Sequence, residues 1–125
     1  MLPKKFLYKE TVYMGGGIYI VKLENEGLKI QHDRFIHKSD AVVKPTLKEW
    51  EDFFNSVVNL NLKPEEPKHL ICDGREVKSH NIFKNKRIKF YIINPDFENF
   101  EEFRTLVNSL TICDDYPNGL LEQED

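Results

Sequence analysis

The sequence predicts an α+β fold, in which a single, largely antiparallel sheet of about six strands carries two helices packed on one face. Two observations lead to this fold class. Short runs rich in β-branched and aromatic residues follow one another with only turn signals between them, as antiparallel strands do. Two longer segments instead repeat apolar residues every three or four positions, which is typical of amphipathic helices. The expected order along the chain is βββ-α-βββ-α.

Three strands are expected in the first third of the chain, over residues 6–14, 17–24 and 28–35. Three consecutive glycines, Gly15 to Gly17, separate the first two. A phosphate-binding loop would require a helix directly after the glycines, but strand-forming residues follow them. The triplet therefore predicts a hairpin turn, and Asn25 to Gly27 predict a second one.

The first helix is expected to begin at a capping box, in which Thr46 and Glu49 satisfy each other's backbone amides. One apolar stripe follows, formed by Leu47, Trp50, Phe53, Phe54, Val57 and Val58. The helix should end near residues 60–62, because Pro64 and Pro67 cannot continue it. Residues 39–45, just before it, show no alternation and predict no strand.

Three further strands are expected over residues 69–73, 76–83 and 87–93, with a turn at 73–74 and a hairpin loop at 84–86 whose Asn85 tolerates positive φ. Asn94 and Pro95 suggest the cap and first turn of the second helix. Its apolar stripe comprises Phe97, Phe100, Phe103, Leu106, Val107 and Leu110. We thus expect one α+β domain over residues 1–113, with residues 114–125 as an acidic, mobile tail.

The composition is that of one ordinary domain of 125 residues, 40% hydrophobic and 31% charged, with a net charge of −3. This charge gives no overall basic signature for nucleic-acid binding. The two cysteines, Cys72 and Cys113, are too few for a disulfide framework and are expected to be reduced thiols. The chain shows neither a signal-peptide pattern nor a membrane-spanning run, so a cytoplasmic location and no membrane partner are expected.

Side chains that could bind a metal or act in catalysis do not form a recognisable constellation. His32, Asp33 and His37 surround the end of the third strand, while His69, Cys72 and Asp73 lie in one expected strand, and neither set has a zinc spacing. Ser79 and His80 are neighbours in a strand and should point to opposite faces. Neither cysteine has the electropositive setting of a reactive thiol. The sequence therefore predicts no catalytic residue, no metal and no cofactor.

A basic segment is the strongest candidate for a binding site. It lies in the second hairpin, residues 75–91, and its suggested contact residues are Arg75, Lys78, His80, Arg87, Lys89 and Tyr91. If the two strands place these side chains on one face, that face could bind an acidic protein or a nucleic acid. The alternative is an ordinary solvated face whose lysines protect a sheet edge from aggregation.

Three stretches resemble a layout found in small bacterial proteins. They are "TLKEWEDFF", "CDGREVKSHNIF" and "FYIINPDFENFEEFRTLVNSL", which supply a W-x-x-F helix, an Asp-Gly turn, a hairpin, and an Asn/Pro entry into a Phe-rich helix. Proteins with this layout are mostly uncharacterised or look like immunity proteins of toxin systems. The resemblance covers residues 46–110 and implies the same fold order. It departs at Arg75 to Val77, where the layout usually has a tryptophan.

From these observations we expect a non-enzymatic protein-binding module that acts through an exposed sheet face or edge, and the resemblance implies an immunity-like role for it. The alternative is a nucleic-acid-associated module that uses the same basic hairpin. A third class, a small enzyme or ligand carrier, would need a pocket between the helices and the sheet.

Overall fold

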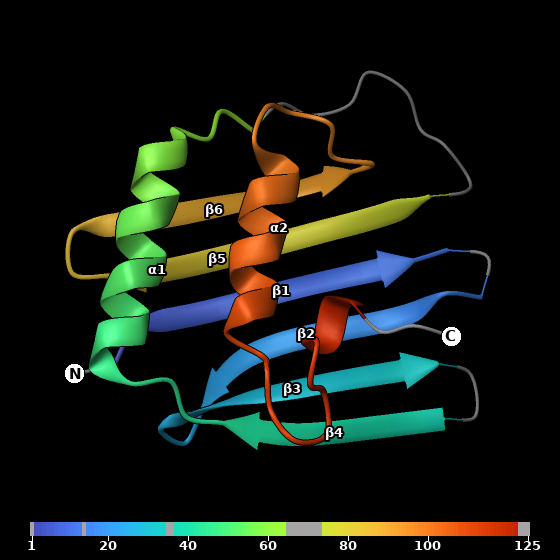
Figure 1. Ribbon diagram of the computed structural model, residues 1–125. Coiled ribbons are helices and arrows are strands. Elements are labelled where there is room, and N and C mark those ends of the chain that lie inside the picture. The colour runs from blue at the N-terminus through green and yellow to red at the C-terminus, as the bar shows by residue number, and fades with distance from the viewer. Residues whose placement is uncertain (1, 14, 35–36, 65–73, 123–125) are drawn as a thin grey trace.

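The computed structural model describes residues 2–13, 15–34, 37–64 and 74–122. Six strands form one sheet in the order β4-β3-β2-β1-β5-β6, and every neighbouring pair is antiparallel (Figure 1). The strands are β1 (Lys5–Val12), β2 (Gly17–Glu24), β3 (Gly27–Arg34), β4 (His37–Val43), β5 (Arg75–Phe83) and β6 (Lys86–Ile93). The helices are α1 (Leu47–Leu60), α2 (Phe100–Ser109) and the short 3₁₀ helix η1 (Leu120–Glu122).

The predicted α+β class, with one antiparallel sheet and two main helices, is confirmed, but the strands are distributed differently. Four strands precede α1, because β4 occupies the segment in which no strand was expected. β4 is an edge strand with polar residues at its start, so it lacks the apolar alternation of strands that are buried on one face. The strand expected over 69–73 lies outside the described residues.

The glycine triplet is a hairpin turn, as predicted, since β1 and β2 on either side of it pair with each other. Gly17 has a φ of +88°, and a Cβ at this position would lie 2.4 Å from the carbonyl oxygen of Asp33 on β3. A residue with a side chain would therefore collide with the neighbouring backbone. In the other turns the left-handed residues include Asn25, Glu26 and Lys84, so the expected left-handed Asn85 is wrong by one position.

Helix α1 begins as predicted, with both hydrogen bonds of the capping box between Thr46 and Glu49. Its apolar face packs on the sheet, where the Trp50 ring lies 5.3 Å from that of Phe6. The aromatic residues of α1 and α2 that are buried in this core are Trp50, Phe53, Phe54, Phe100 and Phe103. Burying such large side chains contributes most of the free energy that holds the helices on the sheet.

The predicted start of the second helix at Asn94 is wrong. Asn94 adopts a left-handed φ of 50°, and its side-chain oxygen accepts a hydrogen bond of 2.8 Å from the amide of Arg75, so it closes the end of the β5–β6 hairpin. Helix α2 starts instead at Phe100, after Asn99. The Asn99 side chain donates to the carbonyl oxygen of Leu60 at the end of α1, which ties the two helices together.

The segment after α2 also differs from the expected tail. Tyr116, Leu120 and Leu121 are buried in the core, and Leu120 is fully inaccessible. The segment crosses the same face of the sheet as the helices, over β2 and β3 (Figure 1). Three large apolar side chains in an otherwise acidic stretch are enough to bury it, so the packed domain extends past residue 113 to Glu122.

The sheet therefore has two unlike faces. Helices α1 and α2 and the C-terminal segment all lie on one face, which we call the helical side (Figure 1). On the opposite face, the outer face, no described segment covers the strands. Among the described residues, no helix has the length and apolar character needed to cross a membrane.

Candidate functional site

The pairing of β5 with β6 brings most of the predicted contact residues together. Lys78 is paired with Tyr91, His80 with Lys89, and Ile82 with Arg87. Paired residues of antiparallel strands lie on the same face, and the face alternates along each strand. Core residues such as Val77 and Ile92 occupy the helical side, so these partners point to the outer face. Five of the six predicted residues thus share one surface.

Strand β1 extends this surface with two lysines. The β1–β5 pairing places Lys9 opposite Lys78, and Lys5 opposite Ile82. The same alternation puts both lysines on the outer face, where both are exposed. We call the resulting surface the basic face, and it consists of Lys5, Lys9, Lys78, His80, Arg87, Lys89 and Tyr91. Sequence reasoning did not include these two lysines, because the tertiary structure determines which strand lies next to β5.

Glu76 marks one end of the basic face. Its carboxylate accepts hydrogen bonds from the hydroxyl groups of Tyr13 and Tyr91. These hydrogen bonds hold the pKa of Glu76 below its usual range and raise the pKa of Tyr91. The Tyr91 ring is thereby fixed while 52% of its surface remains exposed, which is a suitable arrangement for contact with a partner.

His80 lies at the centre of the basic face and is half-buried. Burial is the largest cause that lowers its pKa, and the charges of Lys5, Lys89, Arg87 and Lys78 lower it further. An imidazolium at this position would be repelled by cations from three strands. Both effects favour the neutral imidazole of His80 in the free protein.

Arg75 does not belong to the basic face, so the six suggested contact residues do not all share one surface. It occupies the helical side, where its guanidinium lies 5.0 Å from the centre of the Phe100 ring. It also pairs with Glu101 and lies 3.7 Å from Glu10. The alternation along β5 places Arg75 with Val77 and not with Lys78, which is why the two basic residues point apart.

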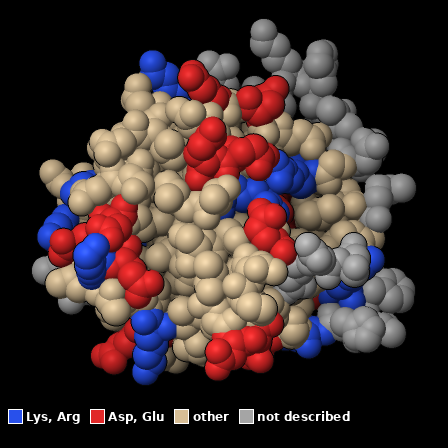
Figure 2. Space-filling view, viewed as in Figure 1, with Lys and Arg blue, Asp and Glu red and all other residues tan. Residues whose placement is uncertain are grey.

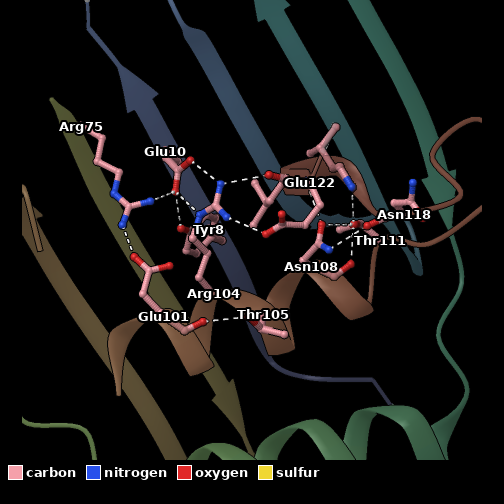
Figure 3. A network of polar contacts seen from close by, with 12 residues as sticks. Tyr8, Glu10, Arg75, Glu101, Arg104, Thr105, Asn108, Thr111, Asn118 and Glu122 are labelled. Atoms are coloured by element: carbon pink, nitrogen blue, oxygen red, sulfur yellow. Dashed lines mark hydrogen bonds and ion pairs between the residues drawn. The ribbon is translucent and has the colours of Figure 1, made fainter. Parts of the chain in front are cut away.

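A second group of charged residues is buried on the helical side (Figure 3). Glu10 of β1 is only 1% exposed, and Arg104 of α2 donates two hydrogen bonds to its carboxylate, of 2.9 and 3.0 Å. The Tyr8 hydroxyl donates a third, of 2.7 Å. Arg104 also binds Glu122 and the carbonyl oxygen of Leu121. We call Tyr8, Glu10, Arg104 and the charged residues paired with them the buried cluster, and it ties the C-terminal segment to the sheet.

The buried cluster is internally satisfied. Burial alone would raise the pKa of Glu10, but the hydrogen bonds and charge of Arg104, together with Tyr8 and Arg75, outweigh it and lower the pKa. Burial also raises the pKa of the Tyr8 hydroxyl well above its usual value, so it remains a donor. A carboxylate that is ionised and fully hydrogen-bonded is poorly placed for proton transfer, and the geometry indicates a structural role.

A related arrangement fixes the end of the chain (Figure 3). The Asn108 side-chain oxygen accepts from the amide of Leu121, and the Thr111 hydroxyl oxygen accepts from the amide of Leu120, at 2.8 and 2.7 Å. Asn108 also donates to the carbonyl oxygen of Asn118. These bonds satisfy the backbone of a segment that would otherwise be buried without partners.

The other candidate chemistry is not assembled in the described part of the chain. Within it, no group of three or more His, Cys, Asp or Glu side chains could hold a metal ion. Ser79 is buried and donates to the carbonyl oxygen of Leu7, while His80 is on the opposite face, as predicted. Cys113 is a half-buried free thiol. His69, Cys72 and Asp73, and the side chain of His37, lie outside what the structure describes.

The hollows on the helical side include two with volumes above about 400 Å³. One of about 430 Å³ lies between the helices and is lined by Ser56, Leu60, Glu101, Glu102, Thr105 and Leu106. The other, of about 720 Å³, lies between β4 and the C-terminal segment and is lined mainly by polar residues that include Asp40, Asp115 and Asn118. Neither brings together a nucleophile and a base, nor a cluster of like charges comparable to the basic face.

Comparison with protein-family models, curated proteins and solved structures finds no match to this chain. The function proposed below therefore depends on the geometry and charge of the chain's own residues.

Proposed function

We propose that this chain is a non-enzymatic, cytoplasmic protein-binding module that uses the basic face to bind an acidic surface of another protein. The observation that supports it is the register of β1, β5 and β6, which gathers five cations and an exposed tyrosine on a sheet face that no described segment covers. Clustered like charges repel one another in the free protein, and an acidic partner relieves this repulsion.

The size of the basic face favours a protein over a nucleic acid. It spans three strands, roughly 10 Å, and the stretch from Arg87 to Tyr91, roughly 13 Å. Glu76 closes one end of it, and a phosphate backbone that continued along the strands would meet this carboxylate. The helical side is also acidic, as Figure 2 shows, since residues 47–60 and 94–122 contain ten acidic and two basic side chains. A compact acidic patch fits this charge pattern better than a long polyanion.

A nucleic-acid-associated role for the same face is the second candidate. It is favoured by the exposed ring of Tyr91 beside lysines on an open sheet, because single-stranded nucleic acids stack bases on aromatic side chains of such surfaces. Tyr91 is the one aromatic side chain of the basic face, whereas binding of several successive bases usually employs more.

An immunity-like role is the specific form of the proposal that the resemblance in sequence layout supports. In that role the basic face would block a toxin by binding an acidic part of it. A neighbouring gene for a toxin, and stable co-purification of its product with this chain, would support this form. A toxin-like neighbour whose product does not bind would count against it.

The general proposal can be tested by fluorescence anisotropy with two labelled probes of equal charge, an oligo-glutamate peptide and single-stranded DNA. We expect the peptide to bind more tightly, with an affinity that falls as salt is raised. The double variant Lys78→Glu, Lys89→Glu should weaken binding about tenfold or more, since two attractive contacts become repulsive.

The matched control is the double variant Lys22→Glu, Lys29→Glu. These lysines pair with each other on the outer face of β2 and β3, outside the basic face, and the change in net charge is the same. Equal loss of binding in both variants would show a general charge effect and contradict the proposed site. Tighter binding of the DNA would instead select the second candidate.

A further inference from the structure

A small hollow lies within the basic face, between the outer side chains of β5 and β6. Its volume is about 290 Å³, and it is lined by Lys78, Ser79, His80, Lys89, Phe90 and Tyr91. This volume is at the lower limit for a small-molecule pocket, so it suits a single side chain of a partner. The side chains of Lys78 and Lys89 line the hollow together with the ring of Tyr91.

The imidazole of His80 contributes an unsatisfied polar atom to this hollow. Its Nε2 is buried and has no hydrogen-bond partner among the described residues. Two other described nitrogens share this property, Nε2 of His32 and Nε1 of Trp50, but both residues belong to the helical side. Because a buried polar atom without a partner is costly, a ligand group that supplies the missing partner would bind there favourably.

We propose that this hollow receives one carboxylate from an acidic side chain of the partner protein, and that His80 takes up a proton when the carboxylate binds. This inference rests on the proposed function, and it adds the chemical group that is bound and a dependence on pH. When the carboxylate binds, the neutral imidazole of His80 gains one proton from solvent. The resulting imidazolium donates a hydrogen bond to the carboxylate. The long side chains of Lys78 and Lys89 must part slightly to admit the ligand.

The charges around His80 determine the sign of the pH dependence. Those that act on it are Lys5 from β1, Lys78 from β5, and Arg87 and Lys89 from β6, and all four are positive. Together with burial they hold the pKa of His80 below its usual value in the free protein. A carboxylate in the hollow would offset these charges and raise this pKa. The affinity should therefore increase as the pH falls through the pKa of the complex, and level off below that of the free protein.

The test is to measure oligo-glutamate affinity by anisotropy from about pH 8 to about pH 5.5, for the original chain and for His80→Gln, across the range in which histidine titrates. We expect the affinity of the original chain to rise about three- to tenfold over this range, because each unit of pKa difference corresponds to a tenfold change in affinity. His80→Gln cannot take up this proton, so its affinity should change less with pH over the same range. Any titration of the peptide itself is common to both proteins and is removed by this comparison.

Proton NMR gives a second readout that does not depend on the variant. The Cε1 proton of His80 should titrate at a higher pH when the peptide is present than when it is absent. If His80 titrates at the same pH with and without bound peptide, the inference is overturned. If only DNA shifts it, the bound group is a phosphate and the carboxylate assignment is wrong.

These outcomes are separate from those of the proposed function. Loss of peptide binding in the Lys78→Glu, Lys89→Glu variant with no effect of His80→Gln on the pH profile would keep the function and reject the inference. Unchanged binding in the double lysine variant would reject both.

Discussion

Lys9 and Glu10 are neighbours in β1, but their side chains lie on opposite faces of the sheet and have opposite electrostatic surroundings. The Glu10 carboxylate is 1% exposed and receives hydrogen bonds from Arg104 and Tyr8. Lys9 is exposed on the outer face and is paired with another cation, Lys78. One strand therefore contributes to a buried cluster whose charges are compensated and to a basic face whose charges are not.

This difference indicates what each group of charges is for. In the buried cluster every charged residue has a partner of opposite sign within the chain, so it contributes to a single folded arrangement. On the basic face, folding leaves several cations close together, and among the described residues Glu76 is the acidic side chain at its edge. Charges that the fold itself does not neutralise are available to a partner, and the predictions below test this division.

The largest expected effect is that of Arg104→Ala. It would leave Glu10 buried without its bidentate partner, with Arg75 3.7 Å away as the remaining cation. Breaking one side of a buried ion pair costs about 3–5 kcal/mol in the free energy of unfolding. Urea denaturation followed by circular dichroism would measure it. Lys48→Ala, which removes an exposed i,i+4 pair with Asp52, is the control and should leave the urea unfolding curve almost unchanged. Similar losses in both variants would refute the role given to the buried cluster.

A slightly smaller effect is expected for Leu120→Ala, which tests whether the C-terminal segment is part of the helical side. Leu120 is fully buried, so its truncation should cost about 2–4 kcal/mol. Ile112→Ala is the control, because 52% of Ile112 is exposed and the substitution should change stability by less than about 1 kcal/mol. Thermal or urea unfolding gives the comparison. If Leu120→Ala were as mild as the control, residues after 113 would be a tail after all.

The smallest expected effect on stability is that of Lys78→Glu with Lys89→Glu, the variant that should weaken binding about tenfold or more. Both lysines are exposed and lie among other cations, so their reversal removes repulsion and should change the free energy of unfolding by only about 0.5 kcal/mol, in the stabilising direction. The same urea measurement applies. A large loss of stability would mean that the basic face is needed for folding and is not reserved for a partner.

The elements that could be predicted from sequence are those specified by local patterns. The capping box of Thr46 and Glu49, the alternation in β6 and the turn at Gly17 each depend on residues a few positions apart. β4 and the C-terminal segment were missed because their burial depends on distant partners, as in the hydrogen bond between the hydroxyl groups of Ser39 and Tyr116. A local sequence pattern cannot predict such long-range contacts.

The same reasoning explains the outcome for the candidate site. Lys78, His80, Arg87 and Lys89 could be found because a short hairpin fixes which residues face each other. Arg75 could have been excluded by the alternation of β5, in which it shares the face of Val77. Lys5 and Lys9 could not have been added, since the adjacency of β1 and β5 joins segments about 70 residues apart in the sequence.

The separation of charge between the two sides of the sheet has a consequence for the speed of association. Although the net charge is only −3, the helical side is acidic, as Figure 2 shows, and the basic face is positive. This separation gives the molecule a dipole directed across the sheet. In the field of an acidic partner such a molecule rotates during its approach, so that more of the first encounters occur with the basic face forward. Steering of this kind raises the association rate constant and is reduced by salt, whereas the lifetime of the complex depends mainly on the contacts made once it has formed.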